Sequence, residues 1–153
     1  PRVAVVIDKK TFTRELAAAS GAFGLCIPGL ALADFTFAVG STSGRDEAKF
    51  ARHGVTPLAG PVLGMPVLEA GCAAWLECRL IPARHTEDAY DTCFAEVVAA
   101  AADARIFANG RWSYRSDNAE LQPIHHLGAG QFVRAGGVVQ GVVQNVVQPQ
   151  GPA

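Results

Sequence analysis

The chain has 153 residues, a formal net charge of −1 and no block of basic residues. A nucleic-acid-binding protein normally carries a basic face, so this charge argues against that class. Half of the residues are hydrophobic and only 18% are charged. One domain is expected at this length, and so apolar a composition suits a domain that buries part of its surface against a second subunit.

The four cysteines, Cys26, Cys72, Cys78 and Cys93, include no CxxC spacing, which argues against a structural zinc site. Cys72 and Cys78 lie in an alternating apolar run and are predicted to be small core residues. Free thiols of this kind favour a reducing, cytoplasmic setting. We expect neither a membrane span nor a signal peptide.

The first part of the chain predicts a strand followed by a helix. The β-branched run 3–8 is typical of a buried strand, and because the chain opens on it without methionine, we expect an N-terminal piece before it. Thr11 or Thr13 can cap a helix over 12–19 that Gly21 ends. The inner face of this helix is predicted to carry Phe12, Leu16 and Ala19.

A second strand is expected over 22–27 and a short helix over 31–39. The inward residues of that helix are predicted to be Leu32, Phe35 and Val39. Ser43 or Asp46 can then cap a further helix of about two turns that Gly54 ends.

The clearest strand covers 71–81, where the side chains alternate between two faces. One face is predicted to carry Cys72, Ala74, Leu76, Cys78 and Leu80. Residues 91–100 favour another strand, although their alanines also permit a helix. Asn109-Gly110 predicts a two-residue hairpin turn.

Repeated Val-Val-Gln units within 138–148 divide the chain into a domain over 1–137 and a low-complexity tail over 138–153. The tail is either an arm that lies on a partner subunit or a poorly ordered segment. Strands dominate the domain, so we predict a mainly β (α+β) barrel with short helical insertions. No GxGxxG follows a strand, which argues against a Rossmann domain.

Two polar clusters could bind an anion. In the first, a strand passes into a helix whose free N–H groups favour negative charge, and the side chains that strengthen this are Lys10, Thr11 and Thr13. The second cluster covers 41–49, with hydroxyls, a glycine and cations, namely Ser43, Gly44, Arg45 and Lys49. Each cluster alone also fits an ordinary capped helix start with solvated charges.

No catalytic triad, metal site or acid–base pair is apparent. No cysteine has an evident histidine partner, and His125-His126 lacks further ligands at matched spacing. Glu77 and Glu96 lie in strand-like segments and could pair with arginines.

The segment STSGRDEAKFARHGVTP resembles the SxxSGRDxxKFxxxGLTP segment of the flavin reductase-like, FMN-binding split-barrel family, which includes flavoredoxin. Further segments match that family in the expected order, namely RVAVVIDKKTFTREL, MPVLEAGCAAWLECRLI, YDTCFAEVV and LQPIHHLGAGQFVRAG. The matches run from about residue 2 to residue 136, nearly the whole chain apart from the tail.

The resemblance implies a split β-barrel of Greek-key type that pairs as a homodimer and holds FMN at or near the subunit interface. By position, the phosphate-side residues are Lys10, Thr11 and Thr13. The polar residues that approach the flavin or its phosphate are Ser43, Arg45 and Lys49. A dianionic phosphate suits hydroxyls, cations and a helix start, and the redox chemistry would belong to the flavin.

The sequence departs from the family pattern in three places. The family has one or two strands before the matched region that this sequence lacks. Tyr90 stands where members often carry a histidine beside the nicotinamide or substrate, and Ala95 replaces a glycine. His126 stands near a common tyrosine, so Tyr90 and His126 are assigned to the substrate side.

The activity implied by the resemblance is an FMN-dependent oxidoreductase that uses NADH or NADPH to reduce free flavin or another small acceptor. It could serve as the reductase component of a two-component monooxygenase. Two alternatives stay open. The substitution at Tyr90 favours a non-enzymatic FMN electron carrier or flavin-binding module, and the short N-terminus favours a truncated relative without flavin.

Overall fold

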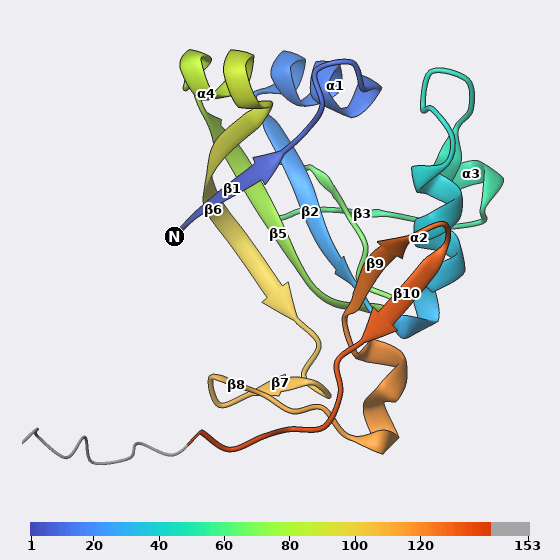
Figure 1. The fold of residues 1–153 in the computed structure, drawn as a ribbon. Coiled ribbons are helices and arrows are strands. Elements are labelled where there is room, and N and C mark those ends of the chain that lie inside the picture. Colours follow the sequence, from blue (N-terminus) through green and yellow to red (C-terminus); the bar gives the residue numbers. More distant parts are fainter. Residues whose placement is uncertain (142–153) are drawn as a thin grey trace, which may run out of the picture.

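The computed structural model describes residues 1–141. Its main feature is a curled, four-stranded antiparallel sheet in the order β1-β6-β5-β2 (Figure 1). These strands are β1 (Arg2–Val6), β2 (Ala22–Pro28), β5 (Cys72–Ile81) and β6 (Thr92–Ala102). The predicted mainly β, α+β architecture is thereby confirmed.

Short helices and two-stranded hairpins surround this sheet. The helices are α1 (Phe12–Ser20), α2 (Ala33–Gly40), α3 (Lys49–Arg52) and α4 (Arg84–Tyr90), with 3-10 turns η1 (Leu30–Leu32) and η2 (Ser116–Leu121). The hairpins are β3 (Leu58–Ala59) with β4 (Pro66–Val67), β7 (Phe107–Ala108) with β8 (Arg111–Trp112), and β9 (Ile124–Gly128) with β10 (Gln131–Arg134). Helices α1 and α4 lie at one end of the sheet, and β7, β8 and η2 lie at the other (Figure 1). No helix within residues 1–141 has the length and apolarity needed to cross a membrane.

Strand β1 lies at an edge of the sheet, so the prediction of a buried strand over 3–8 is wrong. Within residues 1–141 it pairs only with β6, and its side chains alternate between exposed and half-buried positions. Val6 is 75% exposed. A β-branched run shows that a segment suits a sheet, but whether its faces are covered depends on distant parts of the chain.

Helix α1 begins and ends as predicted but turns a different face inward. The Thr11 hydroxyl accepts the N–H of Arg14 at 3.3 Å, and Gly21 ends the helix in the left-handed conformation at φ 70°. Ala17 is buried, whereas Leu16 is 54% exposed, so the predicted inner face is wrong. The helix instead directs Arg14 toward an acidic partner on α4, as described below.

A β-bulge interrupts strand β5, so the prediction that its side chains alternate without a break is wrong at Ala73. Ile27 of β2 lies opposite Ala74, but the next residue, Pro28, lies opposite Cys72, so Ala73 has no partner on β2. A bulge of this kind re-aims the neighbouring side chains. Ala73 is fully buried in a core cluster with Ile106 and Leu121. Cys72 and Cys78 are both buried, which confirms them as core residues.

The helix predicted from Ser43 or Asp46 is wrong in its start and its length. Helix α3 has only four residues, Lys49–Arg52, and its N-cap, Ala48, makes no side-chain hydrogen bond. The hydroxyl of Ser43 instead accepts the N–H of Arg45 at 3.2 Å within a loop. Such a local side-chain bond competes with helix formation.

Two local predictions are confirmed later in the chain. Residues 91–100 form most of strand β6, not a helix. Asn109 and Gly110 connect β7 to β8 with φ values of 52° and 72°, as expected for this turn. Residues 138–141 have no regular secondary structure, and the rest of the predicted tail lies outside the described residues.

Candidate functional site

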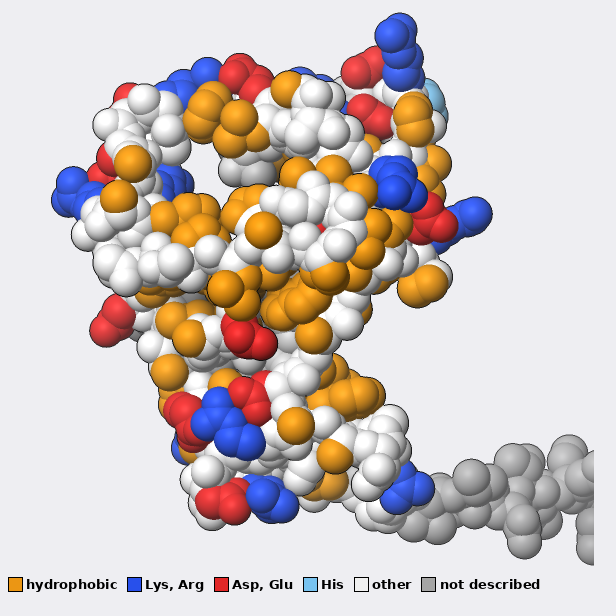
Figure 2. Space-filling model, turned by 180° about the vertical axis from the view of Figure 1, so that it is seen from behind, with side chains coloured by type: hydrophobic (Ala, Val, Ile, Leu, Met, Phe, Trp, Pro, Cys, Tyr) orange, Lys and Arg blue, Asp and Glu red, His pale blue; other side chains and the backbone are white. Residues whose placement is uncertain are grey.

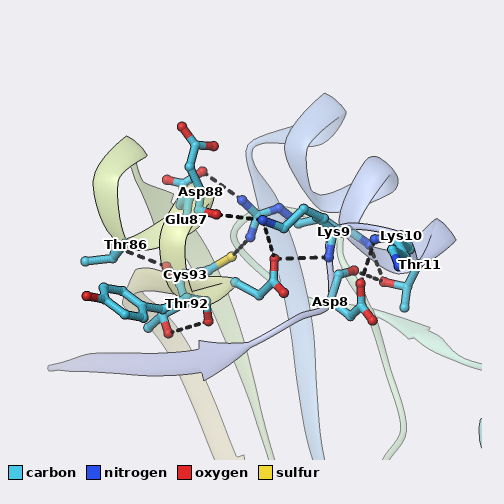
Figure 3. Close-up of polar contacts among 12 residues, drawn as sticks. Asp8, Lys9, Lys10, Thr11, Thr86, Glu87, Asp88, Thr92 and Cys93 are labelled. Atoms are coloured by element: carbon cyan, nitrogen blue, oxygen red, sulfur yellow. Dashed lines mark hydrogen bonds and ion pairs between the residues drawn. The ribbon is translucent and has the colours of Figure 1, made fainter.

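The first polar cluster occupies the turn between β1 and α1 (Figure 3). Asp8 organises this turn, because its carboxylate accepts the N–H of Lys10 at 2.8 Å. Its carbonyl oxygen accepts both the hydroxyl and the N–H of Thr11, at 2.8 and 3.0 Å. The hydroxyl of Thr11 therefore has a double structural role, as a donor to Asp8 and as the cap of α1.

Two cations that adjoin this cluster, Lys9 and Arg14, are directed to groups on and just after α4. The Lys9 ammonium donates to the carbonyl of Asp88 at 2.6 Å and lies 3.4 Å from the carboxylate of Asp91. The Arg14 guanidinium bonds the Glu87 carboxylate at 2.9 Å and also contacts the Cys93 sulfur (Figure 3). These contacts join α1 and the turn before it to α4, and they give both cations acidic or carbonyl partners within the protein.

The remaining donors of this cluster face outward. Lys10 and Thr13 are exposed, and neither side chain makes a hydrogen bond within residues 1–141. In the same described part of the chain, the N–H groups of Phe12 and Thr13 have no acceptor. An ammonium, a hydroxyl and two backbone donors at the start of a helix suit an anionic group.

The second cluster, 41–49, is a loop stabilised by its own side chains. The Lys49 ammonium donates to the carbonyls of Val39 and Thr42, the latter at 2.6 Å. The hydroxyl of Ser41 donates to the carbonyl of Phe37 at 2.7 Å. Lys49 therefore positions the loop through backbone oxygens.

Arg45 brings the two clusters together. Its guanidinium bonds the Glu15 carboxylate at 2.5 Å and lies 4.9 Å above the ring centroid of Phe12. A side chain at Gly44 would begin 3.2 Å from the same ring, so glycine permits this close approach. Hydrogen bonding to Arg45 lowers the pKa of Glu15. Arg45 thus contacts two side chains of α1, one of which, Phe12, is next to Thr13 in the chain.

An open pocket of about 300 Å³ lies between α2 and the β9–β10 hairpin. Its lining comprises Thr36, Phe37, Gly40, Ser41, His126 and Phe132. The His126 ring is 4.9 Å from that of Phe132 and 6.2 Å from that of Phe37, measured between centroids. Ser41, the first residue of the second cluster, forms part of the wall, so this ring-lined pocket adjoins the polar loop.

Tyr90 lies apart from that pocket, at the end of α4. It is 65% exposed, and its ring meets His85 edge-on with centroids 6.0 Å apart. Within residues 1–141, no hydrogen bond or ring contact joins Tyr90 to His126. The two residues assigned to the substrate side are therefore not in contact in one protomer.

Glu77 and Glu96, suggested as partners of arginines, differ in their surroundings. Glu96 lies 3.5 Å from Arg79 on the surface. Glu77 is fully buried and accepts backbone N–H groups from the 60–65 loop, namely those of Val62, Leu63 and Met65, at 2.8, 3.0 and 3.1 Å. Burial raises the pKa of Glu77, but these hydrogen bonds outweigh it and leave the pKa below its ordinary value. Glu77 is a structural carboxylate.

Several acidic residues that organise the site were not among the predicted site residues. Asp8 had a local signal, because an aspartate just before a helix cap commonly forms a turn with its own backbone. Glu15 and Glu87 had none, because their arginine partners are 30 and 73 residues away in the chain. The ring-lined pocket likewise depends on a hairpin that is distant in sequence from α2.

The model of the flavin reductase like domain family matches residues 1–116. The chain belongs to this family. The Escherichia coli (strain K12) protein YddH is 55% identical over 136 residues, which make up 89% of this chain and 71% of YddH. The family membership predicted from the 41–57 segment is confirmed.

Solved structures of family members share the fold. An FMN-binding domain of a flavin reductases-like enzyme from Shewanella baltica is 36% identical and superposes with a TM-score of 0.87, over 93% of this chain and 74% of that one. Flavoredoxin of Desulfovibrio vulgaris is 22% identical, with a TM-score of 0.75 over 92% of this chain and 73% of that one. The predicted split barrel is therefore confirmed, and a flavin-related oxidoreductase function follows at the level of the family.

Proposed function

We propose that this protein binds FMN and acts as an FMN-dependent oxidoreductase, with NADH or NADPH as the electron donor. The observation that carries the proposal is the contact of Arg45 with Glu15 and Phe12, which brings the 41–49 loop to the start of α1. Two polar segments that are distant in sequence thereby become one surface with unused donors.

The phosphate of FMN would lie at the outward-facing donors of α1. The side chains of Lys10 and Thr13 and the N–H groups of Phe12 and Thr13 are available there. Arg45 can turn to a phosphate because its bond to Glu15 is half-exposed. Thr11 and Ser43 would support the site mainly through the turns that they stabilise. Lys49 would hold the loop in place.

The planar ring would face the pocket between α2 and the β9–β10 hairpin. Phe37, His126 and Phe132 provide ring surfaces there, and planar aromatic ligands stack on such surfaces. His126 would lie on the substrate side of the ring. When bound, FMN supplies hydride and electron transfer from the nicotinamide to free flavin or another small acceptor. This activity suits the reductase component of a two-component monooxygenase.

A non-enzymatic FMN electron carrier is the second candidate, and Tyr90 favours it. Family members often carry a histidine at this position, whereas Tyr90 is a largely exposed phenol against His85. A carrier would need the flavin site but no nicotinamide site.

We also propose that the protein acts as a homodimer in the cytoplasm. Hydrophobic side chains gather across the middle of the face shown in Figure 2, with most charged side chains toward its margins. Large apolar residues with more than half of their surface exposed include Val6, Leu16, Val62, Tyr90 and Leu127. Exposed apolar surface of this extent favours burial against a second subunit. Separately, the four free thiols suit a reducing compartment, which supports the cytoplasmic location. Sedimentation as a monomer at micromolar concentration would contradict the dimer.

Titration with FMN tests the site, with tryptophan and flavin fluorescence as readouts. We expect Thr13→Ala with Arg45→Ala to weaken FMN binding by at least tenfold, because a hydroxyl and a charge leave the phosphate site. Arg115→Ala is the matched control, since Arg115 pairs with Asp117 outside the site. Unchanged affinity in the double variant would overturn the assignment.

Anaerobic addition of NADH or NADPH to the FMN-loaded protein separates the two candidate functions. Bleaching of the visible flavin absorbance supports the oxidoreductase. A yellow protein that neither nucleotide bleaches would support the carrier.

A further inference from the structure

Cys26 and Cys72 form a pair of thiols that the proposed flavin site does not use. Cys26 lies in β2 and is half-buried, and Cys72 opens β5 and is buried. The two strands are hydrogen-bonded neighbours in the sheet. All four cysteines of the chain are free thiols in the structure.

The β-bulge places both thiols on one face of the sheet. Cys26 lies opposite Trp75, and Pro28, two residues further along β2, lies opposite Cys72. Side chains two residues apart in a strand share a face, so Cys26 and Cys72 are diagonal neighbours. Without Ala73 as the extra residue, the register would turn Cys72 to the other face.

The surroundings favour a thiolate at Cys26. The N–H of Leu68 donates to the Cys26 sulfur at 3.2 Å. A hydrogen bond from Cys72, reinforced by that N–H, lowers the pKa of Cys26 to about 7, although burial opposes this. The same interaction raises the pKa of Cys72, which therefore keeps its proton. A thiolate bonded to a thiol is a pairing suited to disulfide chemistry.

The other two cysteines provide an internal contrast. Cys78 and Cys93 are buried, and for both of them burial raises the thiol pKa. Cys72, in contrast, borders an open pocket of about 250 Å³ with Glu69, Trp75 and Asp103 in its wall. Cys26, the partner of Cys72, is only half-buried, so a small disulfide can reach this pair more readily than the two fully buried thiols.

We propose that Cys26 and Cys72 form a redox-active dithiol that a small disulfide, such as oxidised glutathione, converts to an intrachain disulfide. The Cys26 thiolate attacks one sulfur of glutathione disulfide, forming a mixed disulfide and releasing one glutathione thiolate. Cys72 then attacks the Cys26 sulfur, the Cys26–Cys72 bond forms, and the second glutathione leaves. The Cys72 proton passes to a departing glutathione, so the dithiol loses two electrons and glutathione disulfide gains them.

A disulfide requires Cα atoms within roughly 7 Å, and diagonal neighbours in a regular sheet lie about 7–8 Å apart, at or just beyond that limit. The bulge bends β5 locally and so provides the adjustment that flat strands would lack.

The test treats the full-length protein with oxidised glutathione near neutral pH, alkylates the remaining thiols and maps the peptides by mass spectrometry. We expect a Cys26–Cys72 disulfide, with Cys78 and Cys93 alkylated only after unfolding. The Cys72→Ala variant should stop at glutathione bound to Cys26, because the resolving thiol is absent. Cys78→Ala is the matched control and should still form the disulfide.

Two results would overturn the proposal. One is a wild-type protein in which Cys26 reacts no faster than Cys78 under native conditions. The other is a mixed disulfide at Cys26 that persists while Cys72 is present. As an independent readout, we expect the rate of Cys26 alkylation to rise with pH through a midpoint near 7. A midpoint above about 8.5, that of an ordinary cysteine, would contradict the interaction between the two thiols. None of these measurements depends on flavin binding.

Discussion

Two glutamates in different regions of the molecule show that the same type of side chain can stabilise the fold in one place and belong to a ligand site in another. Glu77 is fully buried in β5 and accepts three backbone N–H groups from the 60–65 loop. Glu15 is 54% exposed on α1 and pairs with Arg45. The pKa is lowered at both residues, at Glu77 by hydrogen bonds that outweigh burial and at Glu15 by its bond to Arg45.

This difference in burial distinguishes a carboxylate that stabilises the fold from one whose cation partner is available to a ligand. The Glu77 interactions leave no room for change, because a Cβ atom on Gly60 would lie only 2.1 Å from the carboxyl carbon. The Glu15–Arg45 pair is open to solvent, and an exposed pair contributes little to stability. Arg45 can therefore exchange Glu15 for an incoming anion without loss of the fold.

Replacing the buried carboxylate should have the largest effect. In Glu77→Gln the side chain keeps its size but loses its charge and can no longer accept all three N–H groups. We expect Tm to fall by roughly 5–10 °C, since hydrogen bonds to a charged acceptor are lost in the interior. Glu96→Gln, at an exposed position of the same sheet, is the control and should change Tm by less than about 2 °C. Equal effects of the two variants would contradict the structural role of Glu77.

Acid should remove the advantage that the wild type has over Glu77→Gln. The folded-state pKa of Glu77 lies below the ordinary value of 4.5, so its charge stabilises the fold fully above that value. The stabilisation is lost as the pH falls through the folded pKa. We expect the difference in Tm to be constant from about pH 6 to 8 and to shrink below about pH 4. A difference in Tm that grows on acidification would contradict a lowered pKa of Glu77 in the folded state.

Releasing Arg45 should have the smallest and most specific effect. In Glu15→Gln the guanidinium loses its charged partner and becomes available to a phosphate. We expect FMN to bind roughly two- to fivefold more tightly, with Tm nearly unchanged, because only an exposed pair is lost. Fluorescence titration and thermal unfolding measure the two quantities. Weaker binding in this variant would mean that Glu15 positions Arg45 for the ligand.

Local chemistry in the sequence determined much of the fold. Thr11 and Gly21 define the ends of α1, because a hydroxyl can satisfy a free N–H and glycine readily adopts a positive φ. Asn109-Gly110 determines a hairpin for the same conformational reason. The family, and with it the split barrel, followed from the segment at 41–57 together with the segments that accompany it.

Only the tertiary structure decided which of these groups remain available. It made β1 an edge strand, paired Arg14 with Glu87, and brought Arg45 to α1. It also inserted the bulge at Ala73 that puts two thiols together. The physical reason is that burial, register and charge pairing depend on neighbours that lie far away in the chain, whereas caps and turns depend on the adjacent residues alone.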